Sequence, residues 1–182
     1  MNFIETALEG VFIIEPRVFT DERGYFFESY SKAAFEAAGL HYDFVQDNQS
    51  KSVYGTVRGL HFQKGEHSQA KLVRVLEGTV LDVAVDLRRA SPTYGRHVAV
   101  ELSAENNRQL LIPRGFAHGF SVLSETAVFA YKCDNLYCRE SEGGIRFDDP
   151  TLAIDWCIDP AKALTSEKDK LHPYVTEFVS CF

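Results

Sequence analysis

Titratable side chains recur in this sequence inside runs that otherwise resemble core-forming β-strands. His61 lies in the run Val57–Gln63, Lys71 begins the next apolar run, and Tyr131 alternates with Phe129. Each has a structural alternative: a hydrogen-bonded core histidine, a solvated lysine and a core-filling tyrosine. What favours a site is the number of polar groups on strands that should supply the core. These groups are His61, Gln63, Lys71, Arg74, His118 and Tyr131.

Three further blocks carry groups that could bind a polar ligand. A turn at Asp21–Gly24 places Arg23 at the mouth of the strand that follows. The run Val45–Ser50 is rich in amides, which suit a base edge or sugar hydroxyls. His118 follows the turn Pro113–Gly115 on the next expected strand. Taken singly, each block also has an ordinary explanation. Composition alone favours a surface hairpin at Asp21–Gly24, Val45–Ser50 could be a polar loop, and His118 could make a structural hydrogen bond.

Several classes of chemistry are disfavoured. The chain has no glycine-rich dinucleotide fingerprint, P-loop, nucleophile elbow or HExxH motif. A net charge of −7 argues against nucleic-acid binding, although local arginines can still bind a phosphorylated small molecule. We expect no metal, because His61 has no histidine two residues away. The nearest other histidine, His67, is six residues on in a polar loop, and three more lie in unrelated settings: His41, His97 and His172.

The elements that must position these groups are mainly strands. In Val80–Leu87 the apolar residues alternate with Asp82 and Asp86, and Lys71–Leu76 precedes it, so a turn at Glu77–Gly78 predicts a hairpin. Further strands are expected at His97–Leu102, Gln109–Ile112, Gly119–Leu123 and Ala127–Lys132. Only Lys32–Ala38 indicates a clear helix, and a second short one is expected near Ser166. The pattern predicts one all-β (mainly β) domain over residues 1–182: a sandwich, jelly roll or barrel.

The N-terminus and the cysteines indicate a compartment. The first residues lack the pattern of a signal peptide, and the apolar run Val11–Ile14 is too short to span a bilayer. The four cysteines show no CxxC spacing, so we expect free thiols. The sequence predicts a cytoplasmic protein without a membrane role.

Together these blocks closely resemble the dTDP-4-dehydrorhamnose 3,5-epimerase family, from about Asn2 to about Leu171. Several short motifs in the right order make this resemblance specific, where any single one would be weak. The motifs are Phe19–Glu28, Gln46–Asn48, Arg58–Gln63, Lys71–Arg74, Ile112–Phe120, Tyr131–Lys132, Glu142–Ile145 and Lys168–Asp169.

The resemblance implies a cupin-like jelly-roll β-barrel with one or two short helices, which forms a homodimer. It also implies a reaction: inversion of C3 and C5 of dTDP-4-dehydro-6-deoxy-D-glucose to give dTDP-4-dehydro-L-rhamnose. Since the ketone is already in the substrate, neither cofactor nor metal is required.

The same resemblance implies residue roles. His61 is the general base, Asp169 its carboxylate partner, Tyr131 the general acid and Lys71 the cation beside the C4 oxygen. The diphosphate would be held by Arg23 and Arg58. The nucleotide and sugar site would be lined by Glu28, Gln46, Asp47 and Asn48, with lesser contacts from His118, Glu142 and Lys168.

Other functions stay open on the sequence. A 3- or 5-epimerase of another dTDP-4-keto-6-deoxy sugar would share the base and the acid. A 3,4-ketoisomerase is disfavoured, because Tyr131 and the His61–Asp169 pair suit inversion better. A metal-dependent cupin oxygenase is disfavoured, because this sequence lacks the ligand set of such an enzyme. A non-catalytic sugar-binding barrel is disfavoured too, because it would not need a base, a lysine and a tyrosine together.

Overall fold

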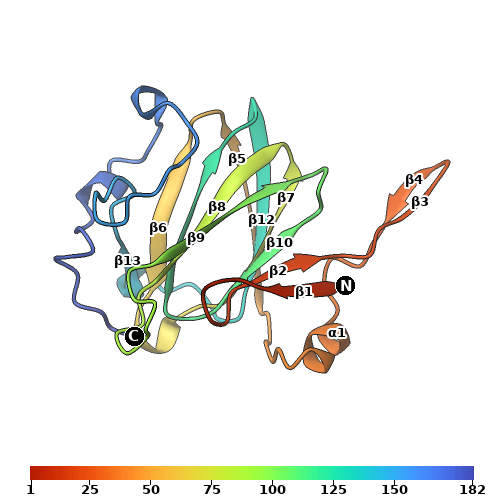
Figure 1. Cartoon of the computed structure of the whole chain (residues 1–182), viewed down its shortest axis with the longest axis horizontal. Helices are drawn as coiled ribbons and strands as arrows, with labels where there is room; N and C mark the ends of the chain where they lie inside the picture. Colours follow the sequence, from red (N-terminus) through yellow and green to blue (C-terminus); the bar gives the residue numbers. More distant parts are fainter.

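Two antiparallel β-sheets face each other in the computed structural model, which describes residues 1–182 (Figure 1). The six-stranded sheet has the order β1 (Asn2–Glu5), β2 (Phe12–Glu15), β10 (Gln109–Ile112), β7 (Lys71–Glu77), β12 (Thr126–Cys133) and β5 (Gln46–Val53). The five-stranded sheet has the order β13 (Glu142–Gly144), β6 (Val57–Gln63), β11 (Phe116–Val122), β8 (Thr79–Asp86) and β9 (His97–Ser103). The only α-helix is α1 (Lys32–Ala37), and single 3₁₀ turns lie at η1 (Gly65–His67), η2 (Arg139–Ser141), η3 (Pro160–Lys162) and η4 (Asp169–Leu171).

Strand β8 shows how the core is divided. Its neighbouring residues alternate between two apolar layers, as the period of two requires. Ala84 faces the main core between the sheets, where it meets residues such as Phe120 and Val73. Leu81 and Val83 face outward and are covered by the C-terminal segment (Figure 1). Both faces are therefore buried, and the odd-numbered face predicted for Val80–Leu87 is confirmed.

The outer face of the six-stranded sheet is partly covered by α1. Phe35 is the helix's buried residue and packs with Ile14 and Leu72. The Ser31 side chain accepts a hydrogen bond from the Ala34 amide, which satisfies one of the free donors of the first turn. The helix ends before Gly39, whose φ of +78° only glycine adopts easily. The predicted helix is confirmed to within one residue.

The predicted hairpin at Glu77–Gly78 is wrong. Strand β7 pairs with β10 and β12, whereas β8 pairs with β11 and β9 in the other sheet. Gly78 has a φ of +77°, and a Cβ there would lie 2.1 Å from the Thr126 carbonyl oxygen. The turn is therefore a corner that carries the chain from one sheet to the other.

The remaining strand predictions hold within three residues. Gln109–Ile112 is observed with the predicted bounds, and the largest difference is at β11, which begins at Phe116 instead of Gly119. Near Ser166 the structure has only the 3₁₀ turn η4, so the predicted helix there is one turn that begins three residues later. The two facing sheets form the cupin-like jelly roll that the resemblance implies. None of its helices has the length and apolar character needed to cross a membrane.

A two-stranded arm stands away from both sheets (Figure 1). It consists of β3 (Phe19–Asp21) and β4 (Gly24–Phe26), which pair antiparallel around the predicted turn. Every residue of both strands is exposed. The arm makes the predicted surface hairpin, and it carries large aromatic side chains into solvent: Phe19, Tyr25 and Phe26.

Candidate active site

A cavity of roughly 630 Å³ opens between the two sheets and holds most of the predicted site residues. Strands of both sheets and the segment from Leu164 to Asp169 line it. Nine predicted site residues lie on its wall: Asn48, Arg58, His61, Lys71, His118, Tyr131, Glu142, Lys168 and Asp169. The structure therefore brings together side chains that are up to 121 residues apart in sequence.

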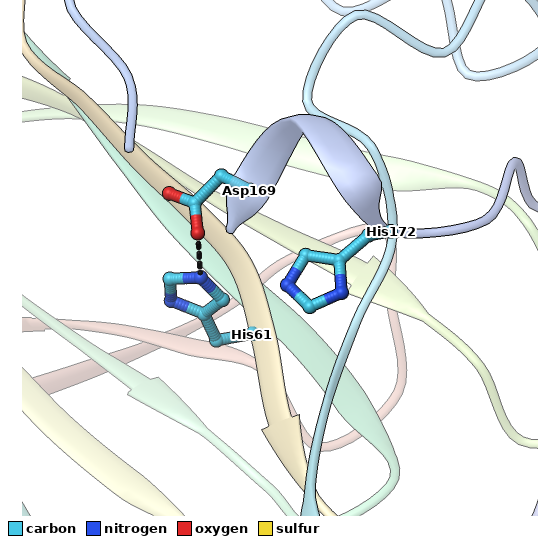
Figure 2. Close-up of side chains that lie close together, drawn as sticks. All are labelled: His61, Asp169 and His172. Atoms are coloured by element: carbon cyan, nitrogen blue, oxygen red, sulfur yellow. Dashed lines mark hydrogen bonds and ion pairs between the residues drawn. The ribbon is translucent and has the colours of Figure 1, made fainter. Parts of the chain in front are cut away.

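His61 and Asp169 form a hydrogen-bonded pair on this wall (Figure 2). Nε2 of His61 lies 2.7 Å from Oδ1 of Asp169, whose side chain is only 6% exposed. Burial alone would raise the pKa of Asp169, but hydrogen bonds from His61, Ser166 and the Gly59 amide outweigh it and lower the pKa. The carboxylate therefore stays charged and accepts a hydrogen bond from the Nε2–H of His61. This leaves the Nδ1 lone pair of His61 free to act as a base.

A bulge in β6 turns Arg58 and His61 toward the same cavity. Strict alternation would place these two side chains on opposite faces. In the ladder with β11, however, His118 pairs with His61 and Phe120 pairs with Arg58, so β6 carries one extra residue. The bulge therefore brings Arg58 and His61 to one side of β6.

Gly59 is required where the bulge passes β11. Its φ is +135°, and a Cβ at this position would lie 2.5 Å from the Cα of Gly119. No side chain fits that gap without moving one of the two strands. The spacing of Arg58 and His61 in the cavity thus depends on a backbone contact between two glycines.

Lys71 and Tyr131 reach the cavity from the opposite sheet. Lys71 lies on β7 and Tyr131 on the neighbouring β12, with Nζ of Lys71 5.9 Å from the centre of the tyrosine ring. Burial raises the pKa of Tyr131, so the phenol stays protonated near neutral pH. Burial lowers the pKa of Lys71, while nearby Cys133 and Asp82 oppose that shift.

A second histidine–carboxylate pair lies deeper in the barrel. Nε2 of His118 is 2.8 Å from Oδ1 of Asp82, and both side chains are buried. Burial lowers the pKa of His118, although Asp82 opposes the shift. The other carboxylate oxygen of Asp82 is buried without a hydrogen-bond partner. The sequence indicated only that Asp82 faces away from Leu81, and nothing in its spacing identified it as the partner of His118.

Glu142 and Lys168 form an ion pair at the edge of the cavity. Tyr137 donates a further hydrogen bond to Glu142 over 3.1 Å. Burial would raise the pKa of Glu142, but the bonds from Lys168 and Tyr137 lower it. The pair offers one positive and one negative group to a polar ligand.

Four predicted residues do not line this cavity. Gln46 accepts a hydrogen bond from the Tyr137 amide, and Asp47 pairs with Lys132 over 2.9 Å. Arg23 is bound to Asp21 in the exposed arm, and Glu28 is exposed just beyond it. Their roles in binding stay predictions.

His172 does not lie in a setting unrelated to His61, so the prediction made for it is wrong. Its ring lies 5.8 Å from that of His61, centre to centre (Figure 2). One ligand atom from each of His61, Asp169 and His172 lies within 4.8 Å of the others, so these three side chains could hold a metal ion. Ser166 was also missed as a positioning group: its hydroxyl accepts a bond from the Asp169 amide over 3.1 Å. Contacts across a 3₁₀ turn leave no periodic signal in the sequence.

Known proteins share this architecture over nearly the whole chain. The family model described as dTDP-4-dehydrorhamnose 3,5-epimerase matches residues 5–177. A curated relative of that name from Salmonella typhimurium is 53% identical over 178 residues, which are 97% of each chain.

Two solved structures agree in fold as well as in sequence. The dTDP-4-dehydrorhamnose 3,5-epimerase from Elizabethkingia anophelis is 58% identical with a TM-score of 0.93 and covers 97% of both chains. The Legionella pneumophila enzyme, solved in complex with dTDP-4-keto-L-rhamnose, is 49% identical with a TM-score of 0.93 over 98% of this chain and 94% of that one. The chain therefore belongs to the dTDP-4-dehydrorhamnose 3,5-epimerase family of isomerases.

Proposed function

We propose that this chain inverts C3 and C5 of dTDP-4-dehydro-6-deoxy-D-glucose to give dTDP-4-dehydro-L-rhamnose. One observation carries the proposal: His61 and Tyr131 reach into the same cavity from opposite sheets. Inversion needs a base on one side of the sugar ring and an acid on the other. A single group would return the proton to the face it came from.

The chemistry follows from the acidity of the substrate. Hydrogens on C3 and C5 are acidic because the electrons left behind delocalise onto the C4 oxygen. Nδ1 of His61 takes the proton, and Asp169 stabilises the imidazolium that forms. Tyr131, kept neutral by its raised pKa, returns a proton from the other face.

Lys71 supports the charge that develops during the step. Its ammonium lies beside the tyrosine ring, on the wall opposite His61. A cation fixed beside the enolate oxygen stabilises the transition state more than the ketone, and this difference lowers the barrier. The ketone undergoes no net oxidation, so the proposed reaction needs no redox cofactor.

Arg58 is the group on this wall best suited to the diphosphate. Its Nε donates to the Ser52 hydroxyl over 3.1 Å, which leaves the outer guanidinium nitrogens free for two parallel hydrogen bonds. Asn48 and the Glu142–Lys168 pair lie on the same wall and suit the nucleoside and the sugar.

We also propose that the chain works as a homodimer in which the arm reaches the partner's cavity. The arm exposes Phe19, Tyr25 and Phe26, each by more than half. Arg23 carries a side chain 84% exposed on the same arm. A second copy would cover this apolar surface and receive Arg23 and Glu28, which do not line the cavity of their own chain.

Mixing two inactive variants tests this arrangement. His61→Ala and Arg23→Ala are each expected to lose most activity, and a mixed dimer contains one cavity with both native residues. Activity should therefore return after the two are unfolded and refolded together, and light scattering should give the mass of a dimer. A monomer, or a mixture as inactive as its parts, would contradict the proposal.

A reducing compartment, the cytoplasm, is the proposed location. All four cysteines are free, as expected for a chain kept in a reducing compartment. Counting free thiols in protein isolated from its native cell would test this. Disulfide-linked chains there would contradict it.

Analysis of the product by NMR tests the main proposal. The purified chain is incubated with dTDP-4-keto-6-deoxyglucose in deuterated water, and the configuration and label at C3 and C5 are read. We expect inversion and deuterium at both carbons. Inversion at one carbon only would indicate a 3- or 5-epimerase, and no exchange at either would contradict the proposal.

A further inference from the structure

Beside the proposed base lies a third group for which the reaction has no use. His172 follows the 3₁₀ turn that supplies Asp169, and its ring packs edge-on against His61 (Figure 2). Its Nε2 is buried and has no hydrogen-bond partner. A buried nitrogen without a partner costs stability, so its lone pair is available for a ligand.

We propose that His61, Asp169 and His172 form a binding site for Zn²⁺, and that the bound ion switches off the base. The donor set is two imidazoles and one carboxylate, which Zn²⁺ accepts with a water as a fourth ligand. One ligand atom from each side chain lies within 4.8 Å of the others. Ligands of one tetrahedral ion are roughly 3 to 3.5 Å apart at bond lengths of about 2.0 to 2.2 Å, so small side-chain rotations complete the site.

The surroundings leave room for this geometry. His172 packs over Gly144, where an added Cβ would lie 2.5 Å from Nε2. The bare glycine, which pairs with His61 across β13 and β6, lets the imidazole lie close to the His61 strand. Asp169 already lies beside His61, at 2.7 Å, so this pair opens by a fraction of an ångström to admit the ion while His172 closes in.

Zinc binding changes which nitrogen of His61 carries the proton. In the structure Asp169 holds the proton on Nε2, and Nδ1 is the free base. A metal on Nε2 needs the lone pair there, so the remaining proton of the neutral ring moves to Nδ1. Nδ1 can then no longer accept a proton from a sugar carbon. The loss of the base on zinc binding rests on the proposed function, whereas zinc binding itself does not.

Calorimetric titration with Zn²⁺ tests the site in the full-length protein. Substrate is left out, because its diphosphate would also bind zinc. Exposed thiols at Cys157 and Cys181 can bind zinc too, so the decisive quantity is the number of tight sites lost on mutation. We expect His172→Ala to weaken the zinc affinity of one site by about 100-fold or more. Even residues that only hydrogen-bond to a metal ligand typically change the affinity 10- to 100-fold when they are replaced.

His67→Ala is the matched control. His67 also lies beside a carboxylate, with Nε2 3.8 Å from Glu66, but on an exposed turn. It should keep every site of the wild type. His172→Gln serves as a second variant if melting shows that His172→Ala is misfolded. Equal zinc binding by the wild type and a folded His172 variant would overturn the proposal, as would the absence of saturable binding in the wild type.

Two further measurements test the switch. Nitrogen-15 NMR of the imidazoles should show the His61 proton on Nε2 without zinc and on Nδ1 with it. Zinc should inhibit the wild type reversibly, with activity restored by a chelator, and should inhibit the His172→Ala variant far less. An unchanged His61 spectrum in the zinc-bound protein would refute the switch. If the wild type lacks the proposed epimerase activity, the reaction assignment fails, and the titration still decides the site.

Discussion

Replacing Asp169 by asparagine isolates the contribution of the carboxylate to the base. The side chain keeps its size and its contact with the Ser166 turn, but it loses the charge that faces His61. The carbonyl oxygen of an asparagine can accept a hydrogen bond from Nε2–H, but it carries no charge to stabilise the imidazolium. The asparagine can also donate to Nε2 and so hold the proton on Nδ1, the wrong nitrogen for a base.

The structure sets the size of the effect. Nε2 and Oδ1 are 2.7 Å apart, so the two charge centres are separated by about 4 Å. At an effective dielectric constant of about 20, that attraction is about 4 kcal/mol, which corresponds to about a thousandfold in rate. The His61 side chain is 34% exposed, and water weakens the interaction. We therefore expect kcat to fall by about 10² to 10³.

Steady-state kinetics measure this effect directly. KM should change little, because Asp169 acts through His61 and the loss falls on the transition state. Asp155→Asn is the control, since Asp155 is an exposed aspartate that accepts a bond from the Cys157 amide. The two variants should melt at similar temperatures. A kcat for Asp169→Asn within about threefold of the wild type would refute the role given to the pair.

Three further predictions address the cation, the bulge and a buried carboxylate. Lys71→Met should lower kcat by about 100-fold or more with a smaller change in KM, measured by the same kinetics; an unchanged kcat would contradict the placement of its charge. Gly59→Ala should destabilise the fold by more than about 1 kcal/mol in urea unfolding, because its Cβ would collide with Gly119; unchanged stability would contradict the close approach. Burial would raise the pKa of Asp86, but hydrogen bonds from Arg88 and neighbouring hydroxyls lower it to about 2. The charged carboxylate therefore stabilises the fold above about pH 4, and this stabilisation is lost as the pH falls toward 2. Asp86→Asn should remove roughly 2 kcal/mol of this dependence, seen by unfolding at several pH values, and an unaltered dependence would contradict it.

Most strands could be predicted because alternation and turn residues are local signals. Gln109–Ile112 and the helix at Lys32 are found within a residue of their predicted bounds. The turn at Gly78 shows the limit of such signals. Glycine with a positive φ marks a tight change of direction, but it does not say whether the chain returns along the same sheet or crosses to the other. That choice depends on which faces are buried, and β8 is buried on both.

The cavity was predicted more fully than its supporting contacts. Motif order indicated His61 and Asp169, which the structure joins in one pair. By contrast, Asp82 and His172 enter the site through folding alone, across a sheet and a 3₁₀ turn. Neither arrangement leaves a spacing that can be read along the chain. The hairpin that carries Arg23 was predicted from its turn residues, but its separation from both sheets was not, because a turn signal does not say where a hairpin packs.

The exchange of substrate hydrogens in two variants tests most directly whether His61 and Tyr131 act from opposite sides. Each variant is incubated with dTDP-4-keto-6-deoxyglucose in deuterated water, and label at C3 and C5 is followed by NMR. His61→Ala should show no exchange, because the proposed base is removed. Tyr131→Phe should still exchange at C3 but should not complete the double inversion. Exchange and inversion at near-normal rates by His61→Ala would contradict the account.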